Sequence, residues 1–132
     1  MHGGLGAVKY KRFEELPCWN KARELCQAVL ELTSQGGFLR NFSLRDQVLR
    51  AAGSVMDNIA EGFDDGSTRE FIRFLGYAQR SCSEVQSQLY RALDSKYITQ
   101  DKFDQVYEIA SECRKQIKGF RKYLRDTNRN VG

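Results

Sequence analysis

The chain has 132 residues, of which 41% are hydrophobic and 29% charged, a composition typical of one folded domain and not of a disordered chain. No apolar run approaches the roughly 18 residues that a membrane-spanning helix needs, and the N-terminal stretch MHGGLGAVKY lacks the apolar region of a signal peptide. The net charge of +4 is only mildly basic. We therefore expect a cytoplasmic protein that does not associate with membranes.

The sequence offers no pattern for a metal site. Four cysteines (Cys18, Cys26, Cys82 and Cys113) stand singly, and the only histidine is His2. A zinc site needs paired ligands at short spacing, and a di-iron bundle needs Glu-x-x-His on its helices. At apolar helical positions a reduced thiol acts as a small hydrophobe. We predict no metal, no cofactor and no redox role for these cysteines.

The first predicted helix begins at Pro17, which suits the first turn because its missing N–H would be unpaired there. Its apolar residues recur at steps of three and four: Trp19, Ala22, Cys26, Val29 and Thr33. Gly36 and Gly37 then supply residues that readily adopt the positive φ found at helix ends.

The second predicted helix opens at Ser43, with Asp46 three residues later as an N-cap signature. Its apolar line comprises Leu44, Val48, Ala51, Val55 and Ile59. The small residues of RAAGSV in its middle would let a neighbouring helix approach closely. Gly62 is predicted to end this helix.

Two further helices follow. The third begins after the capping box formed by Ser67 and Glu70, and the fourth begins near Thr99. The apolar stripe of the third helix is Phe71, Phe74, Leu75, Ala78, Cys82, Val85, Leu89, Ala92 and Leu93. The stripe of the fourth is Phe103, Val106, Ala110, Cys113, Ile117, Phe120 and Leu124, an alternation of threes and fours that packs helices at a shallow angle.

Four long amphipathic segments with short connections predict an all-α fold, an antiparallel up-down-up-down four-helix bundle. The bundle is expected over residues 13–126, after a flexible leader at 1–12 and before a flexible basic tail at 127–132. The wide apolar stripes and the tyrosines beside them favour burial of the excess surface against copies of the same chain.

The turn between the second and third helices carries residue types that also build active sites. Asn58 lies at the margin of the apolar stripe, and we predict that it hydrogen-bonds across the corner, whereas Glu61 points toward solvent or a neighbouring subunit. Asp64 and Asp65 precede a helix N-terminus, where negative charge is favourable. No histidine or nucleophile–base pair accompanies them. We therefore predict a structural corner, no catalytic residues and no enzyme; the enzymatic alternative would use Asn58 and Glu61 in a subunit cleft.

Charge is unevenly distributed along the fourth helix. Its first half is acidic, and its second half carries seven bases against one acid, Asp126. At about 100° per residue the bases share one broad arc away from the apolar stripe. They are Arg114, Lys115, Lys118, Arg121, Lys122, Arg125 and Arg129.

Two interpretations of this basic arc stay open. Acids early and bases late follow the helix dipole, but that effect fades within about one turn, whereas the basic run is longer. Clustered Lys and Arg are also typical of phosphate binding. Bases elsewhere would extend such a surface, depending on assembly: Arg40, Arg45, Arg50, Arg69, Arg73 and Arg80. No motif for base-specific readout is present.

Several stretches resemble the four-helix-bundle family encoded in intervening sequences of bacterial 23S ribosomal RNA genes. The most specific is DNIAEGFDDGSTREFIRFL, and Glu84, Gln88 and Leu89 match a further E-x-x-x-Q-L pattern. The similarity spans about residues 13–124. The family often has proline where this chain has Met56, which leaves the placement of the following loop open.

The resemblance implies a closed homo-oligomeric ring, typically a pentamer, with a basic surface and no established enzymatic activity. Accessory proteins of diversity-generating retroelements are similar to this family; they bind nucleic acid and assist a reverse transcriptase. We therefore expect a nucleic-acid-binding accessory protein that contacts RNA or DNA phosphates through the seven bases named above. Further subunit or core polar contacts are assigned to Phe71, Arg73, Glu84 and Gln88. The alternative is an adaptor whose basic face docks an acidic protein partner.

Overall fold

The computed structural model of the protein describes residues 10–131, with side chains as far as residue 128. These residues form a 3₁₀ turn, η2 (Phe13–Glu15), and five α-helices: α1 (Pro17–Thr33), α2 (Gly36–Arg40), α3 (Phe42–Asp64), α4 (Thr68–Asp94) and α5 (Gln100–Val131). No strand occurs in the described range. The all-α class is confirmed. Residues 1–9 of the predicted leader lie outside the described residues, and α5 continues past the predicted domain boundary at residue 126.

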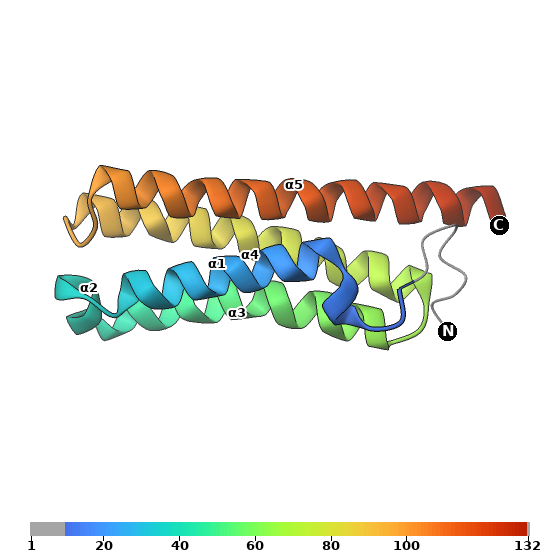
Figure 1. The fold of residues 1–132 in the computed structure, drawn as a ribbon, viewed down its shortest axis with the longest axis horizontal. Helices are drawn as coiled ribbons and strands as arrows, with labels where there is room; N and C mark the ends of the chain where they lie inside the picture. Colours follow the sequence, from blue (N-terminus) through green and yellow to red (C-terminus); the bar gives the residue numbers. More distant parts are fainter. Residues whose placement is uncertain (1–9, 132) are drawn as a thin grey trace.

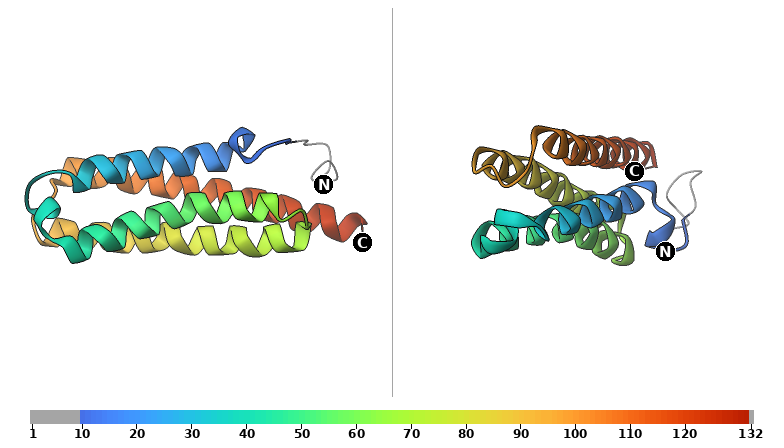
Figure 2. Two further views of the ribbon diagram at one scale, coloured as in Figure 1. Left: turned by 90° about the horizontal axis from the view of Figure 1, so that it is seen from below. Right: turned by 60° about the vertical axis from the view of Figure 1, so that its left-hand side comes forward.

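The four long helices lie side by side along one axis (Figure 1). Helix α3 packs on α1 and α4, and α5 packs on α4 and α1, so that the four apolar stripes enclose one core. The connection from α1 to α3 through α2 and the connection from α4 to α5 lie at one end, and the α3–α4 turn lies at the other (Figures 1 and 2). The largest fully buried side chains include Phe38, Phe63, Phe71, Leu25, Ile59, Leu75 and Ile117.

Helix α1 has the predicted extent, with Pro17 in its first turn. The short helix α2 was not predicted. Gly36 begins it with φ = 55°, and Phe38 within it is fully buried. Gly37 lets the ring of Tyr97 approach, because a Cβ at position 37 would lie 2.7 Å from Tyr97 Cδ1. The pair of glycines therefore turns the chain and also makes room for an aromatic side chain from the connection between α4 and α5.

The predicted N-cap of α3 was wrong by two residues. Asn41, not Ser43, is the cap, and its Oδ1 accepts a hydrogen bond from Leu44 N at 3.1 Å. The Nδ2 of Asn41 also donates to the hydroxyl of Tyr97 at 3.0 Å. Asparagine is among the best N-cap residues. The bond to Tyr97 also fixes the Asn41 side chain. The spacing of residues near Asn41 gives no sign of this long-range contact.

The predicted end of α3 was also wrong, because Gly62 is buried inside the helix, which continues to Asp64. A Cβ on Gly62 would lie 2.6 Å from Phe74 Cβ and 3.0 Å from Phe71 Cδ1. Gly62 therefore serves close packing between α3 and α4 rather than termination. The positive φ of this turn belongs to Gly66, at 91°. The predicted cap of α4 is confirmed, since Ser67 Oγ accepts from Glu70 N at 3.1 Å.

Three thiols lie inside the bundle, with Cys18, Cys82 and Cys113 contributed by α1, α4 and α5. Burial raises the pKa of Cys18 to about 12. Contact with the thiol of Cys82, followed by burial, raises the pKa of Cys113. Cys26 is only partly buried and donates to Ala52 O at 3.0 Å, and burial raises its pKa to about 11. Cys26 therefore connects α1 to α3 and is more than a member of the apolar stripe.

Replacing Gly62 by alanine is expected to destabilise the protein by about 1–3 kcal/mol, because the new methyl group overpacks the α3–α4 contact. Gly53 provides the matched control. It lies in the same helix with nothing within 4 Å of its Cβ position, so Gly53→Ala should be neutral or stabilise by up to about 1 kcal/mol through helix propensity. Urea unfolding of both variants measures the difference. Equal stabilities would show that α3 and α4 do not meet at Gly62.

All four thiols are expected to resist a disulfide reagent such as dithiobis(nitrobenzoate) at pH 8 in the folded protein. Burial and the raised pKa values of Cys18, Cys26 and Cys113 keep the reactive thiolate scarce at this pH. In denaturant the pKa values should return toward about 8.5, and all four should react. Rapid reaction of one or more thiols without denaturant would contradict this packing.

Candidate functional site

The basic residues of α5 form a surface on the second half of that helix. Arg114, Lys115, Lys118, Lys122 and Arg125 are exposed, and Arg121 is partly buried. Arg129 lies on α5, but its side chain is outside the described part. The arginines and Lys118 follow one another at steps of four, three and four, so they share one line along the helix.

Arg121 fixes the position of this line relative to α4. Its Nε donates to the backbone oxygen of Ile72 at 3.0 Å. Its guanidinium lies over Gly76, where an added Cβ would be 2.7 Å from Nη2. Burial, and then the positive charges of Arg125 and Arg80, lower the pKa of Arg121. The basic line of α5 therefore borders α4 at Gly76, and the exposed Arg80, one helical turn along α4 from Gly76, belongs to the same surface.

Neutralisation of this surface by acids is incomplete. Lys122 Nζ pairs with Asp126 Oδ2 at 2.8 Å. Within the described residues, no ion pair involves the other exposed bases of the second half of α5, which are Arg114, Lys115, Lys118 and Arg125. In the acidic half of α5, Glu112 accepts from Lys21 of α1 at 2.8 Å. Acids and bases of α5 are thus segregated along the helix. One of the acids, Glu112, pairs with a base of α1.

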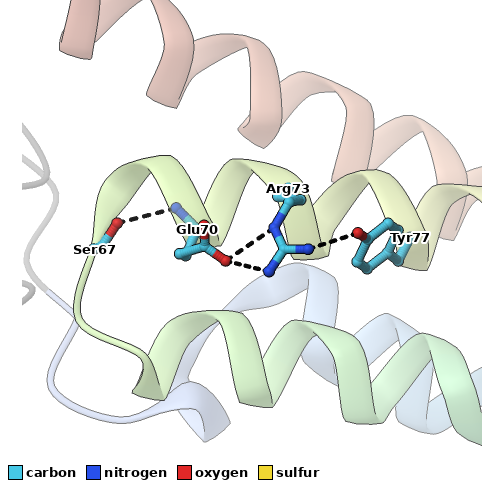
Figure 3. A network of polar contacts seen from close by, with 4 residues as sticks. All are labelled: Ser67, Glu70, Arg73 and Tyr77. Atoms are coloured by element: carbon cyan, nitrogen blue, oxygen red, sulfur yellow. Dashed lines mark hydrogen bonds and ion pairs between the residues drawn. The ribbon is translucent and has the colours of Figure 1, made fainter.

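A ladder of polar side chains runs along the first half of α4 (Figure 3). Arg73 donates to Glu70 Oε1 through both Nε and Nη2, and to the hydroxyl of Tyr77 through Nη1 at 2.8 Å. The bonds to Glu70 and Tyr77 raise the pKa of Arg73. The guanidinium of Arg80 lies 5.7 Å from the Tyr77 ring centre. Arg73 is therefore neutralised, whereas Arg80 stacks on an aromatic ring and keeps its charge.

The remaining predicted contact residues do not gather in one place. Asn58 donates to Ser54 O and Ser54 Oγ, both at 2.8 Å, one turn back in its own helix. The expected hydrogen bond across the corner is absent from the described contacts of Asn58. Phe71 is fully buried between Phe63 and Phe120, each ring centre within 6 Å. Phe71 is thus a core residue.

Glu84 and Gln88 line an open groove of about 310 Å³ between α3 and α4, together with Gln47, Arg50 and Ser54. The Oε1 of Gln88 is buried and has no hydrogen-bond partner among the described residues. Glu61 is exposed near the end of α3, away from this set of lining residues. Neither Asn58 nor Glu61 lines this groove.

The convergence of Arg80 with Arg121 was not predicted, because nothing in the sequence shows that the two helices meet there. Gly76, an isolated glycine in a strong helical pattern, is the signal that a side chain or backbone approaches closely at this point. Over the described residues, no group of three or more metal-ligating side chains is placed to hold an ion. The helices of that range also include none long and apolar enough to cross a membrane.

Comparison with known proteins gives a family and a fold. Residues 14–119 match the family described as 23S rRNA-intervening sequence protein. A crystal structure from Bacteroides thetaiotaomicron VPI-5482, described as a protein of unknown function from the S23 ribosomal protein family, is similar in fold, with a TM-score of 0.74 and 22% identity over 80% of this chain and 95% of that chain. No curated protein matches the chain. Because the family match covers most of its length, the chain belongs to the 23S rRNA-intervening sequence protein family.

Proposed function

We propose that the protein is a non-enzymatic, homo-oligomeric accessory protein that binds RNA or DNA through their phosphates. The observation that carries this proposal is the incomplete neutralisation of the α5 bases. Arg114, Lys115, Lys118 and Arg125 are exposed without ion pairs within the described range, and Arg80 adds charge from α4. A face that served only solubility would mix charges of both signs.

Binding of this kind follows from counterion release. Each base that neutralises a phosphate frees a condensed cation, so the affinity falls steeply as salt rises and depends little on sequence. From Arg114 to Arg125 the helix rises about 16 Å at 1.5 Å per residue. That length allows contact with several successive phosphates. Contacts to phosphates alone do not distinguish one base from another.

Exchanging the four exposed, unpaired bases for glutamate (Arg114, Lys115, Lys118 and Arg125) is expected to lower affinity for structured RNA by about 100-fold or more at low salt. Arg121 is left unchanged because it bonds to Ile72. The matched control places four Glu substitutions at Arg23, Arg40, Lys96 and Lys102, which are exposed elsewhere. Filter retention at two salt concentrations, with circular dichroism as a folding check, measures the effect. An equal loss in both variants would assign binding to net charge and not to this face.

An up-down-up-down antiparallel bundle that assembles into a ring is the architecture we propose for the assembled state. The short connections and the alternating ends at which they lie support the antiparallel order. The subunit number of five rests on the family resemblance. Light scattering, with and without RNA, measures the mass of the assembly. We expect the protein component to have about five times the mass of one chain calculated from the sequence. A mass of one or two subunits at micromolar concentration would rule the ring out.

The cellular role we propose is assistance to a reverse transcriptase, or association with an rRNA intervening sequence. The four cysteines, kept as free thiols, support a location in the reducing cytoplasm. No catalytic step is assigned to the protein.

A protein adaptor is the second candidate. It is favoured by an apolar patch at the α2 end, where the side chains of Phe42 and Leu39 are exposed by 67% and 40% beside the basic Arg40. Such exposed apolar groups with a basic neighbour suit an acidic protein partner. Pull-down after nuclease treatment separates the two candidates, because partners that survive the nuclease are held by protein contacts.

A further inference from the structure

Three arginines from two helices converge where α4 meets α5. The guanidinium of Arg121 lies over Gly76. Arg80 stands one turn further along α4 from Gly76, and Arg125 one turn further along α5 from Arg121, each about 5–6 Å along its helix axis. Because α4 and α5 run in opposite directions (Figure 1), Arg80 and Arg125 lie on either side of Arg121. Helical side chains lean toward the N-terminus of their own helix, which directs both flanking arginines back toward Arg121. Burial first, and then the positive charges of Arg125 and Arg80, lower the pKa of Arg121. This set of Arg80, Arg121 and Arg125 is called the arginine seam below.

The arginine seam is held in place from both helices. The bond from Nε to Ile72 O, at 3.0 Å, uses one donor of Arg121 and leaves its terminal nitrogens without a hydrogen-bond partner among the described residues. The ring of Tyr77 lies under the guanidinium of Arg80 at 5.7 Å. Tyr77 is itself fixed by the hydrogen bond from Arg73 and by edge-on contact with Phe74. The side chains of Arg121 and Arg80 are thus ordered before any ligand arrives, whereas the exposed Arg125 adds charge beside them.

Acids on the same turns are already engaged. Glu70 binds Arg73, and Asp126 pairs with Lys122. The seam therefore keeps three positive charges, two of them on ordered side chains, and each guanidinium offers a fork of donors of the kind that suits the oxygens of a phosphate. Like charges held together cost free energy unless an anion lies between them.

We propose that Arg80, Arg121 and Arg125 form a discrete phosphate-binding site at the α4–α5 seam, in which Tyr77 positions Arg80 and Gly76 provides the space for Arg121. The site deepens the proposed function and rests on it for the source of the phosphate. Two sources share this chemistry: the diester of a nucleic-acid backbone and the terminal phosphate of a 5′-phosphorylated strand.

The test uses inorganic pyrophosphate as a small probe, and two oligoribonucleotides of one sequence with a 5′-phosphate or a 5′-hydroxyl. Three variants of the full chain are compared. Tyr77→Leu removes the ring under Arg80, Tyr77→Phe keeps the ring but loses the hydroxyl, and Arg121→Lys keeps the charge but loses the fork. We expect Tyr77→Leu and Arg121→Lys each to weaken pyrophosphate binding by about tenfold, the value of one charge-assisted hydrogen bond. Tyr77→Phe loses the bond from Arg73 but keeps the ring against Phe74 and Arg80, so it should weaken pyrophosphate binding less than Tyr77→Leu does.

Calorimetric titration measures the affinities, and circular dichroism checks that each variant is folded. If only the 5′-phosphate strand gains affinity and Arg121→Lys removes the gain, the site takes a terminal phosphate. If the two strands bind equally and both weaken in Tyr77→Leu, it takes backbone phosphates. Folded variants that all bind pyrophosphate and both strands like the unmodified protein would overturn the site.

Failure of the site and failure of the proposed function give different results. If Tyr77→Leu and Arg121→Lys both retain nucleic acid as the unmodified protein does, and that retention depends on salt, the proposed function stands as diffuse binding by α5. The arginine seam would then be rejected as a binding site. If instead pyrophosphate binding depends on Arg121 but the protein retains no nucleic acid at low salt, the phosphate site is supported. Nucleic acid would then be rejected as its ligand.

Discussion

Close approach of α4 to its two neighbours is the constraint on which the rest of the structure depends. On one side Gly62 of α3 meets the Phe74 side chain, and on the other Gly76 leaves room for the guanidinium of Arg121. Further along α4, away from the α3–α4 turn, the hydroxyls of Ser54 and Ser81 hydrogen-bond across α3 and α4 at 2.9 Å. Small residues at these points bring the backbones together, so that the larger apolar side chains interlock behind them. The position of α4 in turn decides which charges of α4 and α5 share a surface.

The polar contacts of α4 change in character along its length. Near the α3–α4 turn they neutralise charge, as Glu70 does for Arg73. In the middle of α4, Gly76 lies under the guanidinium of Arg121, and Arg80 stands one turn further along the helix. Within the described residues, neither arginine forms an ion pair with an acid. Toward the other end, buried Gln86 donates to Ser111 Oγ at 2.8 Å and closes the interface with neutral groups. The contacts of α4 that stabilise the fold and those that build the candidate site thus follow one another along the same helix.

Much of the fold could be predicted from the sequence. The periodicity of apolar residues located the four long helices, and the Ser67–Glu70 pair located the start of α4 correctly. The errors came where a long-range contact decided the local structure. Asn41 caps α3 while bonded to Tyr97, and Gly62 packs against Phe74, although glycine near a helix end is more often a terminator. The bases of α5 were visible as an arc, but the partnership of Arg80 with Arg121 depends on the register of two helices, which spacing within one helix does not specify.

The segregated charge of α5 has a consequence for how the molecule meets its surroundings. Asp101, Asp104 and Glu108 lie toward the N-terminal end of the longest helix and Arg114 to Arg125 toward the C-terminal end, so the dipole of these side-chain charges opposes that of the backbone. The whole charges of the side chains outweigh the roughly half charges at the helix ends, so α5 keeps a net dipole moment along its axis with the positive end in its basic half. An approaching polyanion would exert a torque on that moment and orient the molecule before contact, which raises the rate of productive encounters at low ionic strength. In a ring of identical subunits the components across the symmetry axis cancel, and only the component parallel to that axis survives.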